Sequence, residues 1–161
     1  MMVTTLNSKT FRLEKNKRKL AELRFPSIWS QRVEAEVPNG ELEILSGGSM
    51  SNKYHYLLNE LDRGTLKVNL WSGKTILEVY WKEDEAPITY RLKSKWTGSK
   101  FTLLDEQKQA LLIIKAKMSW RKMSYRFELE WIKQMEDEDQ AVELAVYALH
   151  AAKVKLAMQS G

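Results

Sequence analysis

The chain has 161 residues, a formal net charge of +5 and no cysteine. Its length is sufficient for a single domain, expected over residues 1–161, that buries its own hydrophobic core without disulfides or metal ions. The absence of cysteine excludes a disulfide framework, thiol nucleophiles and cysteine-ligated zinc.

The first third of the chain is predicted to form antiparallel hairpins. The polar N-terminal segment lacks the apolar region of a signal peptide, which indicates a cytoplasmic protein. Short apolar runs at 11–13 and 20–25 flank a charged turn, as in a hairpin. Residues 33–37 and 41–45 alternate apolar and polar side chains on either side of Asn39-Gly40, a dipeptide typical of two-residue hairpin turns.

The middle of the chain continues in short strand-like segments rich in β-branched, aromatic and aliphatic residues. Short turns or loops separate them, and the loop after residue 81 is acidic. About ten strands are expected altogether, including segments at 54–58, 67–71, 75–81, 88–95, 100–104, 110–117 and 125–131.

One long helix is predicted over residues 137–158. Asp137 is suited to cap its first turn, and acidic residues favour the positive end of a helix. The nearly continuous apolar run within it, residues 141–152, is too short and its flanks too charged to span a membrane, which needs about 20 apolar residues. Its polar residues, with Glu143 and His150 among them, form one narrow stripe, whereas a surface helix is polar over most of its circumference. The helix should therefore be enclosed by the preceding strands.

Two architectures are compatible with this pattern, and both are mainly β (α+β). The first is a closed antiparallel β-barrel of about 10–12 strands around the hydrophobic C-terminal helix. In such a barrel, the strands are about 4.8 Å apart, tilted by about 40°, and about 10 Å from the helix axis. With this geometry, about ten strands are needed to close the barrel. The alternative is an open antiparallel sheet that grips the helix on one concave face. The narrow polar stripe favours the closed barrel.

The order of the C-terminal elements resembles a known superfamily. Segments 90–96, 101–105, 110–117 and 125–130, followed by the apolar helix, are similar to the tubby C-terminal-like superfamily, as are LURP-one-related proteins and phospholipid scramblases. The resemblance implies a twelve-stranded barrel threaded by a hydrophobic helix and, as in tubby itself, binding to phosphoinositides or membrane surfaces. The chain has no match to the tubby phosphoinositide motif and lacks the cysteine-rich segment of scramblases.

Positive charge is concentrated in one part of the sequence. Residues 86–126 contain 10 basic and 2 acidic side chains. Basic residues attract anionic headgroups by about 1 kcal/mol each close to a membrane, and tryptophan favours the interface. The alternative is that these lysines and arginines keep exposed strands soluble. The candidate anion-binding or lipid-binding residues are Lys115, Lys117, Trp120, Arg121, Lys122, Arg126, Arg91, Lys93 and Lys95.

The sequence predicts a non-enzymatic binding module, with no cofactor or metal. His55 and His150 have no partners at metal-ligand spacing, and His150 is expected to be hydrogen-bonded near Glu143 in a structural role. The leading hypothesis is binding of anionic lipid headgroups, with a peripheral position at a membrane. One alternative is a structural or protein-interaction domain without a small ligand. Another is single-stranded nucleic-acid binding, in which tryptophan stacks on bases.

Overall fold

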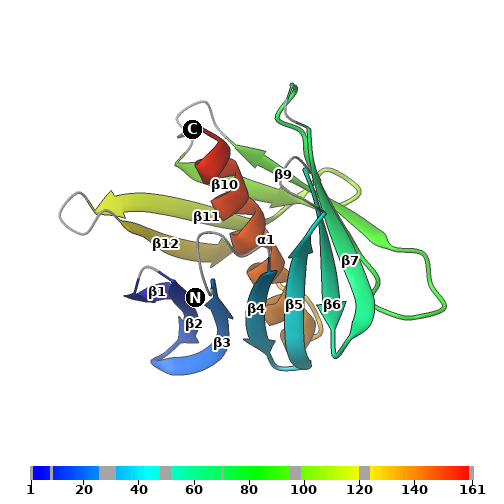
Figure 1. The fold of residues 1–161 in the computed structure, drawn as a ribbon, viewed down its shortest axis with the longest axis horizontal. Helices are drawn as coiled ribbons and strands as arrows, with labels where there is room; N and C mark the ends of the chain where they lie inside the picture. Colours follow the sequence, from blue (N-terminus) through cyan, green and yellow to red (C-terminus); the bar gives the residue numbers. More distant parts are fainter. Residues whose placement is uncertain are drawn as a thin grey trace.

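Within the residues that it describes, the computed structural model has twelve β-strands followed by one α-helix (Figure 1). It describes residues 2–7, 9–25, 32–47, 52–69, 71–94, 99–119 and 124–159. The elements are β1 (Met2–Asn7), β2 (Thr10–Lys15), β3 (Arg18–Arg24), β4 (Arg32–Val37), β5 (Gly40–Ser46), β6 (Lys53–Leu58), β7 (Leu61–Val68), β8 (Thr75–Val79), β9 (Ile88–Ser94), β10 (Lys100–Leu104), β11 (Ala110–Ser119), β12 (Ser124–Trp131) and α1 (Glu138–Gln159).

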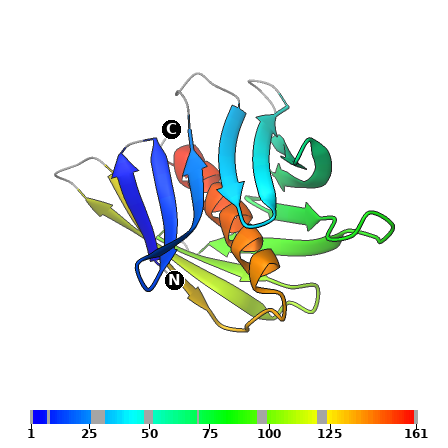
Figure 2. The same ribbon diagram turned by 90° about the horizontal axis from the view of Figure 1, so that it is seen from below.

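The strands form one antiparallel sheet in which each strand pairs with the next along the chain. The sheet curves around α1, with strands on several sides of the helix (Figure 2). Its first and last strands meet at only two residue pairs, Met2 with Glu128 and Val3 with Phe127, whereas eight pairs join β11 to β12. The predicted α+β fold is confirmed, and a sheet gripping the C-terminal helix fits. Complete closure into a barrel stays a prediction.

Alternation along the strands decides which side chains reach the core. In β4, Val33, Ala35 and Val37 are buried, and the two intervening glutamates are exposed. Successive side chains of a strand point to opposite faces, so this pattern places one face of the sheet against the helix and the other in solvent.

The helix is the centre of the hydrophobic core. Every residue from 142 to 152 is buried, so burial continues around the whole circumference of this part of α1. A helix lying on a surface would bury one stripe only. The expected burial of the helix against the preceding strands is therefore confirmed. In the part of the chain that the structure describes, no helix has the length and apolar character needed to cross a membrane.

Replacing Leu149 with alanine should cost about 2 to 5 kcal/mol of unfolding free energy, because the leucine is completely buried and its removal leaves a cavity. Met158→Ala is a suitable control, since Met158 is 37% exposed near the end of the same helix. Urea unfolding followed by circular dichroism measures both. Equal losses for the two variants would show that the middle of α1 is not enclosed.

Candidate functional site

The outer face of β9 to β12 carries an array of basic side chains, here called the basic surface. Pairing of the strands places Lys100 opposite Lys115 and Lys117 opposite Arg126. Cations up to 35 positions apart in the sequence therefore lie close together, on four strands that are neighbours in the sheet. The members are Arg91, Lys93, Lys100, Lys115, Lys117 and Arg126.

Alternation explains why these cations face outward. Leu92 in β9, Phe101 in β10, and Ile114 and Ala116 in β11 are buried against the core. The residues between them must then point to solvent. The hydrophobic pattern that builds the core therefore also fixes the basic surface.

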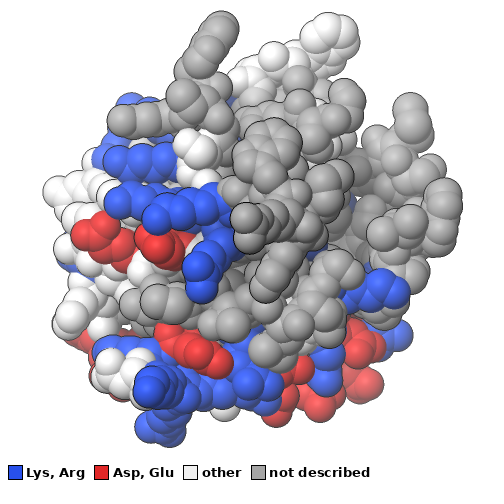
Figure 3. All heavy atoms as spheres, turned by 90° about the vertical axis from the view of Figure 1, so that its left-hand side faces the viewer, with Lys and Arg blue, Asp and Glu red and all other residues white. Residues whose placement is uncertain are grey.

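Acidic partners neutralise the cations on the opposite part of the sheet more completely. On β2 to β5, Lys19 pairs with Glu36 at 3.1 Å and Arg32 pairs with Glu43 at 2.6 Å. On the basic surface, the ion pair found among the described residues joins Lys117 to Glu128 at 3.4 Å, and both side chains are largely exposed. In Figure 3, the side of the molecule with β1, β11 and β12 shows bands of lysine and arginine with acidic groups between them.

The structure brings together five of the nine candidate residues. Lys93, Lys115, Lys117 and Arg126 are exposed, and Arg91 is half-buried on the same face. The other four, Trp120, Arg121, Lys122 and Lys95, lie outside the described residues. Sequence reasoning did not select Lys100, although it immediately precedes Phe101 in a predicted strand and alternation would have placed it outward.

A second group of polar residues is buried between the helix and the sheet. Glu143 is completely buried, and its carboxylate accepts two hydrogen bonds from Arg63, at 2.7 and 3.1 Å. Tyr147 donates another at 2.6 Å, and Asn39 donates a fourth at 3.3 Å. A carboxylate satisfied in this way is held in place by its partners. The arrangement joins α1 to β7 and to the β4–β5 turn, and it suits a structural role.

His150 belongs to the same buried layer. It is hydrogen-bonded as predicted, but its partner is the hydroxyl of Tyr56, 2.9 Å from Nδ1, while Glu143 pairs with Arg63. The ring of Tyr56 stacks on Tyr147 with centroids 4.5 Å apart. Burial, and then the nearby charge of Lys153, lower the pKa of His150 to about 3. The imidazole is thus neutral in the folded protein at physiological pH.

The lowered pKa of His150 should make the fold less stable in acid. Between pH 6.5 and about 3 the unfolded chain binds a proton that the folded chain does not, so stability falls as the pH is lowered through this window. The loss from this group should be about 2 kcal/mol at pH 5 relative to pH 7. Urea unfolding at both pH values should show a smaller acid loss for His150→Gln than for the wild type. Equal losses would contradict the assignment.

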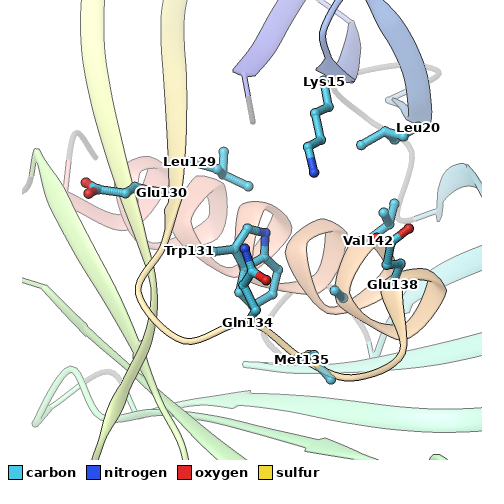
Figure 4. A pocket seen from close by; sticks show the side chains of 10 residues that line it. Lys15, Leu20, Leu129, Glu130, Trp131, Gln134, Met135, Glu138 and Val142 are labelled. Carbon is cyan, nitrogen blue, oxygen red and sulfur yellow. The ribbon is translucent and has the colours of Figure 1, made fainter.

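A cleft of about 360 Å³ opens at the end of the sheet where the helix begins. Figure 4 shows Trp131 and Gln134 at its centre, with the ammonium group of Lys15 directed toward them from above. Glu130 points away from this centre. The remaining lining residues are mainly apolar and come from β3, β12, α1 and the segment that connects β12 to α1: Leu20, Leu129, Met135, Glu138, Ala141 and Val142.

The described residues contain no group of three or more histidine, cysteine, aspartate or glutamate side chains placed to hold a metal ion. Comparison of the chain with protein-family models, curated proteins and solved structures gives no match.

Proposed function

We propose that the chain is a non-enzymatic module that binds anionic lipid headgroups at a membrane surface through the basic surface. The observation that supports the proposal is the gathering of six cations on four adjacent strands, drawn from residues 91 to 126, with little compensation from described acidic side chains. A peripheral position at the membrane follows from this proposal.

The energetics favour joint action of these cations. Neighbouring strands are about 4.8 Å apart, which is less than the screening length of about 8 Å at physiological salt. Each cation near an anionic leaflet contributes about 1 kcal/mol. Three or four of them acting together supply about 3 to 4 kcal/mol, which corresponds to a millimolar Kd before any apolar contact is made.

Charge-neutralised variants test the proposal. A triple variant, Lys93→Gln, Lys115→Gln and Arg126→Gln, should weaken co-sedimentation with anionic vesicles by about 3 kcal/mol, or on the order of 100-fold in affinity. The matched control neutralises three exposed lysines near the opposite end of the sheet, Lys82, Lys108 and Lys133, and has the same net charge. It should bind nearly as the wild type does. Equal weakening in both variants would show that only the total charge matters.

The same proteins separate the alternative functions. Single-stranded oligonucleotides that bind more tightly than anionic vesicles at the same salt concentration would favour nucleic-acid recognition. Binding to neither partner would favour the structural or protein-interaction domain. Light scattering at several protein concentrations would then show whether the chain associates with itself.

We also propose that the sheet closes fully around α1, the architecture that the tubby-like resemblance implies. Met2 and Glu128 are paired across β1 and β12, and paired residues on antiparallel strands have Cα atoms about 4.5 to 5.5 Å apart, within the range that a disulfide spans. Because the chain has no cysteine, a Met2→Cys/Glu128→Cys variant can be oxidised without competing thiols. An intramolecular cross-link is expected, with Met2→Cys/Lys93→Cys as the negative control. Failure to cross-link would favour the open sheet.

A further inference from the structure

The turn between β7 and β8 holds a tryptophan completely in solvent. Trp71 is 100% exposed. Its backbone is fixed, because the side-chain oxygen of Asn69 accepts hydrogen bonds from the N–H groups of Trp71 and Ser72 at 2.9 and 3.1 Å. Lys155 of α1 donates a hydrogen bond of 3.0 Å to the carbonyl of Gly73, which has a positive φ of 71° suited to glycine. The turn is therefore built to present this indole outward.

A groove of about 460 Å³ lies beside the indole, between this turn and the neighbouring strands. Lys67 and Lys74 line it and are both exposed. Within the described part of the chain, neither lysine has an ion pair. Asn52 and Asn69 add amide groups to the lining, so an exposed indole stands next to two cations and several hydrogen-bonding groups.

The groove is continuous with the basic surface. Thr75 pairs with Leu92 in antiparallel strands, so Lys74, which precedes Thr75, and Lys93, which follows Leu92, occupy adjoining positions. Lys67 pairs with Ile76, which in turn pairs with Arg91. Lys67 of β7 and Lys74, immediately before β8, therefore extend the array of β9 to β12 toward the end of the molecule where α1 finishes, in the upper part of Figure 1.

The described loops at the opposite end of the molecule carry more acidic than basic side chains. The loop between β8 and β9 contains Glu83, Asp84 and Glu85, all exposed, and the β10–β11 turn contains Asp105 and Glu106. The first turn of α1, at the same end, is also acidic. An anionic surface would attract the end with Trp71 and repel this one, and such a charge separation orients a protein before contact.

We propose that the protein docks on an anionic bilayer with the C-terminal end of α1 toward the membrane, that Trp71 enters the headgroup layer, and that Lys67 and Lys74 bind a lipid phosphate in the adjoining groove. This inference rests on the proposed function and specifies its orientation and its contact residues. An indole has an apolar body and one N–H donor, which suits the boundary between headgroups and acyl chains. Two ammonium groups supply donors and charge for a phosphate.

Site-specific labelling tests the orientation. Ser72→Cys, next to Trp71, and Asp84→Cys, in the acidic loop, would each carry one environment-sensitive fluorophore, because the chain has no other thiol. On phosphatidylserine-containing vesicles, the emission of the label at position 72 should shift to the blue, as in a less polar environment. The label at position 84 should be unaffected.

Substitutions test the contact residues. Trp71→Ala should weaken binding to the same vesicles about tenfold, the effect of withdrawing roughly half an aromatic side chain from the interface. Lys67→Gln/Lys74→Gln should weaken it about 30-fold. Ile132→Ala is the matched control for Trp71, since Ile132 is 51% exposed and follows β12 near the acidic end, and it should leave binding unchanged.

The outcomes separate this inference from the proposed function. Wild-type binding to anionic vesicles with no spectral change at position 72, or with full affinity in Trp71→Ala, would overturn the docking orientation and leave the basic surface as the binding face. Absence of wild-type binding to these vesicles would overturn both proposals.

Discussion

Replacing Ala148 with glutamate is expected to prevent folding. Ala148 is completely buried in the middle of α1, within a run of eleven buried helical residues from 142 to 152. A carboxylate there would be taken out of water without a positive partner prepared for it, at a cost of several kcal/mol against a total stability of about 5 to 15 kcal/mol. Circular dichroism of the purified protein, and its solubility on expression, measure the effect.

Ala157→Glu is the matched control, since the same substitution is made at an exposed position on the same helix. It should fold, with a cost close to the 0.5 kcal/mol typical of surface sites. If Ala148→Glu were tolerated as well as Ala157→Glu, the helix would not be enclosed, and the arrangement of sheet around helix would be wrong.

Glu143→Ala should have the second large effect, a loss of about 3 to 5 kcal/mol of unfolding free energy. Removal of the carboxylate leaves Arg63, whose side chain is only 15% exposed, without its ion-pair partner. The hydroxyl of Tyr147 also loses its acceptor. Breaking a buried pair from one side is costly because the remaining charge stays buried. Urea unfolding at pH 7 provides the measurement.

A double variant distinguishes loss of the pair from loss of packing. Arg63→Met/Glu143→Leu removes both charges and replaces them with apolar groups of similar size, so it should be substantially more stable than Glu143→Ala. Glu138→Ala, at an exposed acidic position of the same helix, should change stability by about 0.5 kcal/mol or less. If Glu143→Ala behaved like Glu138→Ala, the buried network would not stabilise the fold.

Local sequence signals were sufficient for most of the fold. The helix was predicted at 137–158 and extends over Glu138–Gln159, because its cap and its apolar run are both local. The turn at Asn39-Gly40 was also local, since glycine can adopt the φ of 141° found there. Two parts of the sheet, β1 and the start of β7, were not predicted because they depend on contacts with other segments of the chain. β1 was missed, because only half of its residues are apolar and its pairing with β2 and β12 is not encoded within its own residues.

The start of β7 was missed for a related reason. The segment begins Leu61-Asp62-Arg63-Gly64, whose charged residues and glycine conceal the strand pattern. Arg63 is compatible with a half-buried site because Glu143, 80 residues later, pairs with it. Glycine at position 64 is required by packing, since a side chain there would collide with the backbone carbonyl of Glu78 on β8. None of these contacts can be read from the segment alone.

The sequence predicted which residues of the candidate site are basic and face outward, and the pairing of the strands showed which of them are neighbours. Alternation was enough to place Lys115 and Lys117 on an outer face. The proximity of Lys100 to Lys115 depends on the register of β10 and β11, which the sequence does not specify. Trp71 was expected at the end of a strand, but the strand ends at Val68 and the indole stands on the following turn.

Binding of the wild-type protein to vesicles of defined charge tests the central functional claim most directly. Co-sedimentation is measured with phosphatidylcholine vesicles, with and without phosphatidylserine, at about 0.1 M and 1 M salt. The protein is expected to bind to the anionic vesicles alone and to lose this binding at high salt, where the screening length falls from about 10 to 3 Å. Equal binding to both vesicle types, or no binding to either, would contradict the proposed function.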